Sequence, residues 1–396
     1  MNAIVNRKLV LLIIFFPCLF AFTACAVIKD GSKVIVPFVL LSILITTLTE
    51  KNAKSLLKQN FSTPFYKVIL LMAVFSVLMY YTNGFSSSVV RALLTMSCLL
   101  LFLPWYKLPN KSFNYFVFLG SLTVFINSIY YNVWLEQHRF AGPVNPIPYA
   151  TFCGLLLTTS ICYMIYEKLN RYRILAAAGF FMSGASIILS QSRGVWLAVA
   201  VAITLLIING FRRNIFNWRF SLGIFALIFI VAFVFKPEIS QRIESTKNEL
   251  VQIQQGNLNT SIGLRLQMWM LADDIIDGHY LFGIGASQLG QRLNSLYTEK
   301  IASEEIHEFS PTHLHNQFVD SLVKNGIVGL CIILALLFIP LKHITKKSPA
   351  TRALILCSVA IFLVASLTDV PFNHPQSFTI YIILLSFLNS DQGSSL

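Results

Sequence analysis

The strongest constraint on this chain is a series of long apolar runs separated by short polar breaks. Most runs hold roughly 16 to 23 residues, and about 20 helical residues cross the hydrocarbon core of a membrane. Charged residues make up 12% of the chain, about half of what soluble proteins carry. The pattern therefore predicts an all-α polytopic membrane protein with about 12 transmembrane helices, and it excludes a soluble enzyme and a disordered chain. The expected spans are 9–28, 34–49, 65–82, 88–106, 113–131, 147–166, 174–191, 194–210, 220–236, 318–340, 353–368 and 377–389.

The placement of the basic residues predicts the orientation of these spans. The N-terminal segment and the even-numbered connections hold eighteen of the 30 lysines and arginines, whereas the short odd-numbered connections hold only four. Cytoplasmic loops carry the excess of Lys and Arg, so both termini are expected in the cytoplasm. The net charge of +13 is then a topology signal, and nucleic-acid binding is excluded.

One connection differs from the others in length and charge. Residues 237–317 carry ten acidic residues against five basic ones and lie on the predicted outer face. We expect three parts: transmembrane helices 1–9 in residues 1–236, a periplasmic cap in 237–317, and transmembrane helices 10–12 in 318–396. Within the cap we expect helices near 238–253, 264–277 and 286–300.

Several arginines lie on the predicted outer side close to the membrane. Arg91 is early in the fourth span, Arg139 follows the fifth, and Arg193 occupies the tight turn between the seventh and eighth. Arg265 lies in the long connection. Each could snorkel to lipid headgroups, but together they suit a polyanion such as a pyrophosphate.

The end of the long connection carries His313 and His315. On a continuous helix, His315 would share a face with Gly326 and stand at the outer mouth of the tenth span, where an imidazole could accept a proton from a hydroxyl. The alternatives are an interfacial histidine bonded to backbone or a metal ligand, although no third ligand has suitable spacing. Asp320 and Lys324, four residues apart, are expected to pair.

A second segment of the connection combines Arg265, Trp269 and Asp273 at helical spacing, which places them on one helix face. An ion pair between Arg265 and Asp273 or Asp274 would be a purely structural explanation. Gly283 and Gly285 follow and suit a tight turn.

These segments resemble the O-antigen ligase and O-antigen polymerase superfamily. His315-Asn316, nine residues, Gly326, two residues and Gly329 resemble its H-[NSQ]-x9-G-x2-G motif. Arg265-x3-Trp269 followed by Gly283-x-Gly285 resembles its R-x3-W…G-x-G segment. The isolated Arg193, and Arg139-x2-Gly142 followed by Asn145-Pro146, are similar to further family features.

The resemblance implies a GT-C-like O-antigen ligase in the inner membrane of a Gram-negative bacterium. Such an enzyme transfers O-polysaccharide from undecaprenyl pyrophosphate to a sugar hydroxyl of lipid A-core on the periplasmic face, without metal or other cofactor. His315 would be the base, and Arg193 and Arg265 would hold the pyrophosphate. The remaining substrate-binding residues would be Arg139, Arg91, Asn316, Trp269 and His313.

Two alternatives stay open at this stage. An O-antigen polymerase uses the same donor with a second lipid-linked glycan as acceptor, and the motifs do not separate it from a ligase. A transporter of anionic lipid-linked sugars would also suit twelve spans, but transporters usually have two related halves. Here the long connection has no counterpart in the first half.

Overall fold

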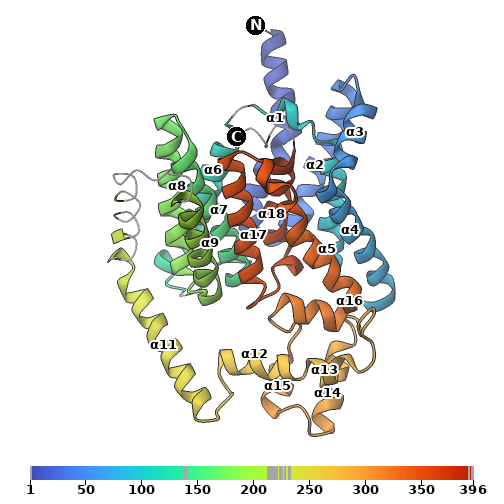
Figure 1. Cartoon of the computed structure of the whole chain (residues 1–396), viewed down its shortest axis with the longest axis vertical. Helices are drawn as coiled ribbons and strands as arrows, with labels where there is room; N and C mark the ends of the chain where they lie inside the picture. Colours follow the sequence, from blue (N-terminus) through green and yellow to red (C-terminus); the bar gives the residue numbers. More distant parts are fainter. Residues whose placement is uncertain are drawn as a thin grey trace.

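The computed structural model is helical throughout its described part, which comprises residues 2–109, 111–137, 139, 141–211, 222, 226, 229–230, 233–390 and 393 (Figure 1). The membrane-type helices are α1 Asn2–Phe22, α2 Gly31–Thr49, α4 Pro64–Asn83, α5 Ser87–Phe102, α6 Ser112–Ser128, α7 Pro146–Tyr166, α8 Asn170–Leu189, α9 Arg193–Phe211, α16 Gln317–Phe338, α17 Pro349–Ala365 and α18 Pro375–Asn389. A short polar helix, α3 (Ala53–Ser62), joins α2 to α4, and α6 ends in a π-helical turn, Ile129–Trp134.

Eight of these helices are long and apolar enough to cross a membrane, namely α1, α2, α4, α6, α7, α8, α9 and α16. Three shorter apolar helices, α5, α17 and α18, accompany them. The chain is therefore a polytopic membrane protein, as expected. The span expected at 220–236 lies largely outside the described residues, so the count of twelve and the orientation remain predictions from the sequence.

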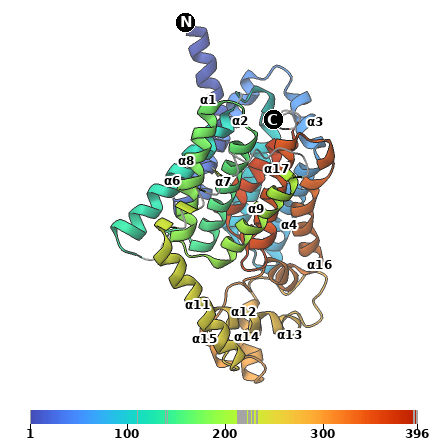
Figure 2. The ribbon, with the colours of Figure 1, turned by 60° about the vertical axis from the view of Figure 1, so that its left-hand side comes forward.

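Two of the short helices, α17 and α18, occupy the middle of the bundle (Figure 1), and the turned view again shows α17 beside α9 (Figure 2). Nearly every residue of α18 is buried, and its Tyr381 ring stacks on Phe362 of α17 with centroids 4.1 Å apart. α7 is buried on almost all sides as well. A helix enclosed by other helices does not have to match the full thickness of the lipid, which explains how 15 residues suffice for α18.

Residues 236–317 form a helical cap at the end of the bundle opposite the start of α1 and the end of α18 (Figure 1). Its helices are α11 Lys236–Gln254, α12 Ser261–Met270, α13 Ala272–Ile276, α14 Leu289–Thr298 and α15 Glu304–Phe309. The expected helices are confirmed, with a break at Leu271 and α15 in addition. A small apolar core of its own includes Met268, Leu296 and Ile306, and reaches Val323 in the first part of α16.

The cap is joined to α16 through a break in that helix. Gly326 has φ +65°, and a Cβ there would collide with the carbonyl of Leu281. The Ile284 and Gly285 amides donate to the carbonyls of Val323 and Lys324 at 2.9 and 3.0 Å. The glycine therefore admits a cap segment, because only glycine adopts this conformation readily at such a close approach.

Candidate active site

The turn that carries the two histidines ends where α16 begins. The Asn316 side-chain oxygen accepts the amides of Phe318 and Val319 at 3.0 and 3.2 Å, which is a helix N-cap. His315 has φ +49° and precedes the helix. The expectation that His315 shares a continuous helix face with Gly326 is therefore wrong, since α16 begins only at Gln317 and is broken at Gly326.

Three polar side chains hold this turn in place. The Trp269 indole donates to the carbonyl of Leu314 at 2.9 Å, and Asp320 accepts the amide of the same residue at 3.0 Å. The Lys324 ammonium donates to the carbonyl of Thr312 at 2.8 Å. Asp320 and Lys324 form the expected ion pair at 2.7 Å. The buried pair and the tryptophan thus fix the backbone on both sides of His313 and immediately before His315.

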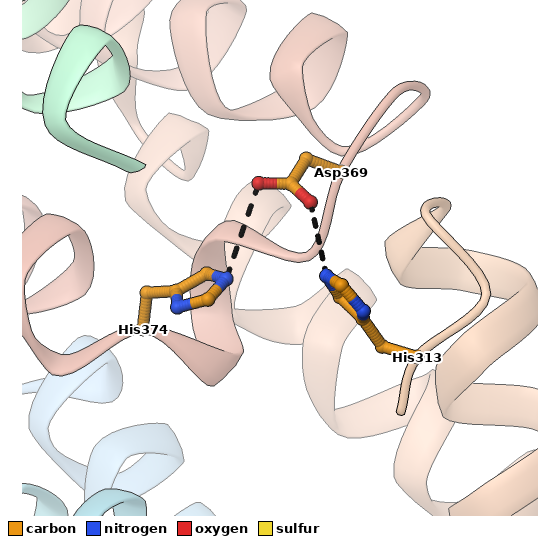
Figure 3. A group of neighbouring side chains, drawn as sticks. All are labelled: His313, Asp369 and His374. Carbon is orange, nitrogen blue, oxygen red and sulfur yellow. Dashed lines mark ion pairs between the residues drawn. The ribbon is translucent and has the colours of Figure 1, made fainter. Parts of the chain in front are cut away.

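The connection between α17 and α18 brings an acidic residue to these histidines. The buried Asp369 carboxylate lies 3.4 Å from His313 Nε2 and 3.5 Å from His315 Nδ1. Its other oxygen lies 3.9 Å from Nε2 of His374 (Figure 3). Sequence reasoning missed Asp369. A usable signal was that it is the only acidic residue between the last two expected spans.

The electrostatics of this cluster keep Asp369 ionised. Burial raises the pKa of Asp369, but the imidazoles of His313 and His315 outweigh it and leave the pKa well below its usual range. Burial lowers the pKa of His374, which favours the neutral ring against the pull of Asp369. The carboxylate lies on the Nδ1 side of His315 without a hydrogen bond to that nitrogen, and an imidazole with a carboxylate on this side uses Nε2 for proton transfer.

Three of these side chains could hold a metal ion. The ligand atoms of His313, Asp369 and His374 lie within 4.8 Å of one another. Two histidines and a carboxylate are a ligand set used by zinc. The spacing of residues near His313 did not predict this group, because Asp369 and His374 come from a distant part of the chain.

The tight turn between α8 and α9 places Arg193 against the cap. Its Nη2 lies 2.8 Å from the carboxylate of Glu249, and its Nη1 donates to the Thr246 hydroxyl at 3.1 Å, both on α11. The next residue, Gly194, packs so closely on Thr368 that a Cβ would collide with it. Since Thr368 precedes Asp369, this packing sets the arginine beside the histidine cluster.

Further arginines surround Arg193. Burial, together with the neighbouring guanidinium groups of Arg193 and Arg139, lowers the pKa of Arg242 on α11 to about 10. Burial also lowers the pKa of Arg265 on α12, whose charge is attracted by Asp369 and repelled by Arg193 and Arg139. We call Arg139, Arg193, Arg242 and Arg265 the arginine cluster. Arg242 was missed because its sequence context is that of an ordinary charged helix.

The remaining expected residues have other neighbours. Arg91 is half-buried on α5. Its charge contributes to lowering the pKa of Asp30, although the ion pair with Lys33 contributes more. Asp273 accepts the Tyr280 hydroxyl at 2.7 Å. Within the described residues, neither Asp273 nor Asp274 forms an ion pair with Arg265.

Comparison with known proteins agrees with the resemblance in the motifs. Residues 178–334 match the family model described as O-antigen ligase. Over 259 residues the chain is 25% identical to the O-antigen ligase of Escherichia coli K12, covering 63% of this chain and 58% of the ligase. Over 324 residues it is 22% identical to an uncharacterised protein of Haemophilus influenzae, covering 77% of this chain and 80% of that protein. The chain carries an O-antigen ligase family domain and is a distant homologue of the E. coli ligase.

Proposed function

We propose that the protein is a GT-C-like O-antigen ligase that transfers O-polysaccharide from undecaprenyl pyrophosphate to a sugar hydroxyl of lipid A-core on the periplasmic face of the inner membrane. The observation that carries this proposal is Arg265, a member of the arginine cluster whose charge interacts both with Asp369 and with Arg193 and Arg139. An anion site and a histidine–carboxylate pair are thereby adjacent. A glycosyl transfer from a diphosphate needs both in one place.

The acceptor hydroxyl attacks the anomeric carbon while the bond from that carbon to the diphosphate oxygen breaks. His315 Nε2 takes the hydroxyl proton, and Asp369 stabilises the imidazolium that forms. The arginine cluster neutralises the charge that grows on the leaving diphosphate. Direct displacement of this kind inverts the configuration at the anomeric carbon.

The other residues of the site position these groups. Trp269, Asp320 and Lys324 hold the turn that carries His315, and Asn316 caps the following helix. No step requires a nucleotide, because the diphosphate donor already carries the leaving group. The site lies at the end of the bundle where the cap begins, so a lipid-linked donor could approach from the bilayer.

The test is reconstitution of the purified protein in liposomes with lipid-linked O-antigen and purified core lipid. The proposal expects high-mass lipopolysaccharide without added nucleotide. Formation of longer lipid-linked glycan without any product on core would identify a polymerase instead. Uptake of the donor with no new glycosidic bond would indicate a transporter.

A further inference from the structure

One face of α11 is turned toward the arginine cluster. Arg242, Thr246 and Glu249 are half-buried at positions i, i+4 and i+7, whereas Ile243 and Leu250 on other faces are exposed. All residues of α11 are described, and none of them is fully buried. Thr246 and Glu249 of this face contact Arg193 at the start of α9.

Glu249 places an anion in the arginine cluster. One of its oxygens lies 2.8 Å from Arg193, and the other accepts the Ile262 amide in the first turn of α12 at 3.2 Å. A guanidinium and a free amide at a helix N-terminus are donors that a phosphate group would also use. The carboxylate thus occupies a position suited to a phosphate.

Arg242 adds a guanidinium that has no matching acceptor. Its Nε is buried and has no hydrogen-bond partner among the described residues. A buried donor without an acceptor is destabilising. Glu249 is one carboxylate among several arginines. An incoming anion would therefore supply the acceptor that Arg242 Nε lacks.

We propose that α11 forms part of the anion site: Glu249 occupies the arginine cluster until a pyrophosphate replaces it, and Arg242 then binds that pyrophosphate. The identity of the anion as the donor's pyrophosphate rests on the proposed function. Replacement breaks the contacts of Glu249 with Arg193 and with α12. Donor binding is therefore coupled to the position of α11. The apparent affinity for pyrophosphate is lower because Glu249 occupies the site in part of the protein.

The experiment is calorimetric titration of the full-length protein in nanodiscs with inorganic pyrophosphate. Glu249→Gln should bind roughly tenfold more tightly than the unchanged protein, because the competing charge is gone. Arg242→Gln should bind roughly tenfold more weakly, because a charged hydrogen bond is lost. The matched control is Glu244→Gln: Glu244 is exposed on the same helix, 3.9 Å from Lys247, and its loss should change nothing.

Opposite effects from two residues of one helix face are not produced by general misfolding. Glu249→Ala serves as a second variant and should bind at least as tightly as the unchanged protein. Unchanged or weaker binding by both Glu249 variants, unchanged binding by Arg242→Gln, or no binding by any variant would overturn the proposal. If the expected shifts occur but reconstitution gives no transfer to core, only the O-antigen assignment fails. If transfer occurs without these shifts, only the role of α11 fails.

Discussion

The Trp269 indole donates to the carbonyl of Leu314 at 2.9 Å, in the peptide that joins Leu314 to His315. This bond connects the cap helix α12 to the proposed base, and α12 also carries Arg265 of the arginine cluster. One short helix therefore fixes both halves of the candidate site. The relationship gives a physical role to the tryptophan of the Arg-x3-Trp motif.

Trp269→Phe removes the donor but keeps an aromatic ring in the apolar core of the cap. We expect kcat to fall roughly fivefold, corresponding to about 1 kcal/mol for a lost hydrogen bond. The KM for the donor should change little, because the arginines remain. Steady-state assays with reconstituted protein check this split. Trp134→Phe is the matched control, since Trp134 is 80% exposed; an equal loss in both variants would contradict the positioning role.

Arg193→Lys should reduce transfer roughly 100-fold. The two terminal nitrogens of Arg193 contact two different groups on α11, and an ammonium on a flexible stem does not reproduce this planar fork. Losing a donor to the developing charge costs a factor of about 100 to 1,000. The measurement is the rate of high-mass lipopolysaccharide formation at saturating donor. A fully active variant would mean that Arg193 serves only to anchor the turn.

Asp369→Asn should lower kcat by at least about 100-fold while the protein still inserts and folds. An asparagine neither carries the charge that stabilises an imidazolium nor selects the required tautomer. Activity at the wild-type level in the variant would rule out this contribution.

The lowered pKa of Asp369 also fixes a pH dependence of stability. A carboxyl with a depressed native pKa contributes stability above its unfolded pKa, about 3.9, and that contribution is lost as the pH falls through the native pKa. The contribution of the Asp369 carboxylate should therefore be present above about pH 5, and the difference in stability between the wild type and Asp369→Asn should shrink as the pH falls from there. Thermal unfolding in detergent across this range tests the sign. A difference that instead grows below about pH 4 would contradict it.

Removal of divalent metal should leave transfer unchanged. His313, Asp369 and His374 could hold an ion, but the proposed reaction uses only proton transfer and arginine electrostatics. Preincubation with EDTA followed by the reconstituted assay is the test, and re-addition of zinc is the control. Strong inhibition reversed by zinc would assign this cluster to a metal.

The sequence predicted the elements whose signals are local. Apolar runs predicted the membrane helices, and the spacing of Asp320 and Lys324 predicted their ion pair. The basic residues flanking the spans also predict the orientation of the bundle. The sequence indicated Arg193 as a candidate site residue, because a charge between two apolar helices is costly without a partner.

The features that the sequence did not predict depend on contacts between distant segments. Asp369 and His374 reach His313 only because α16 and the connection after α17 lie together. Glu249 is the partner of Arg193 because α11 packs against the turn before α9. The left-handed backbone of His315 follows Leu314, whose carbonyl and amide are held by Trp269 and Asp320 from other parts of the chain.

The central claim is that His315 accepts the proton of the acceptor hydroxyl, and the most direct test is transfer by purified His315→Ala in liposomes with lipid-linked O-antigen and core lipid. The matched control is His343→Ala; His343 lies five residues beyond the end of α16. Loss of a general base lowers rates by roughly 100- to 10,000-fold. We predict no detectable high-mass lipopolysaccharide from His315→Ala, unchanged donor binding, and normal product from His343→Ala. Product formation by His315→Ala at the wild-type rate would contradict the account.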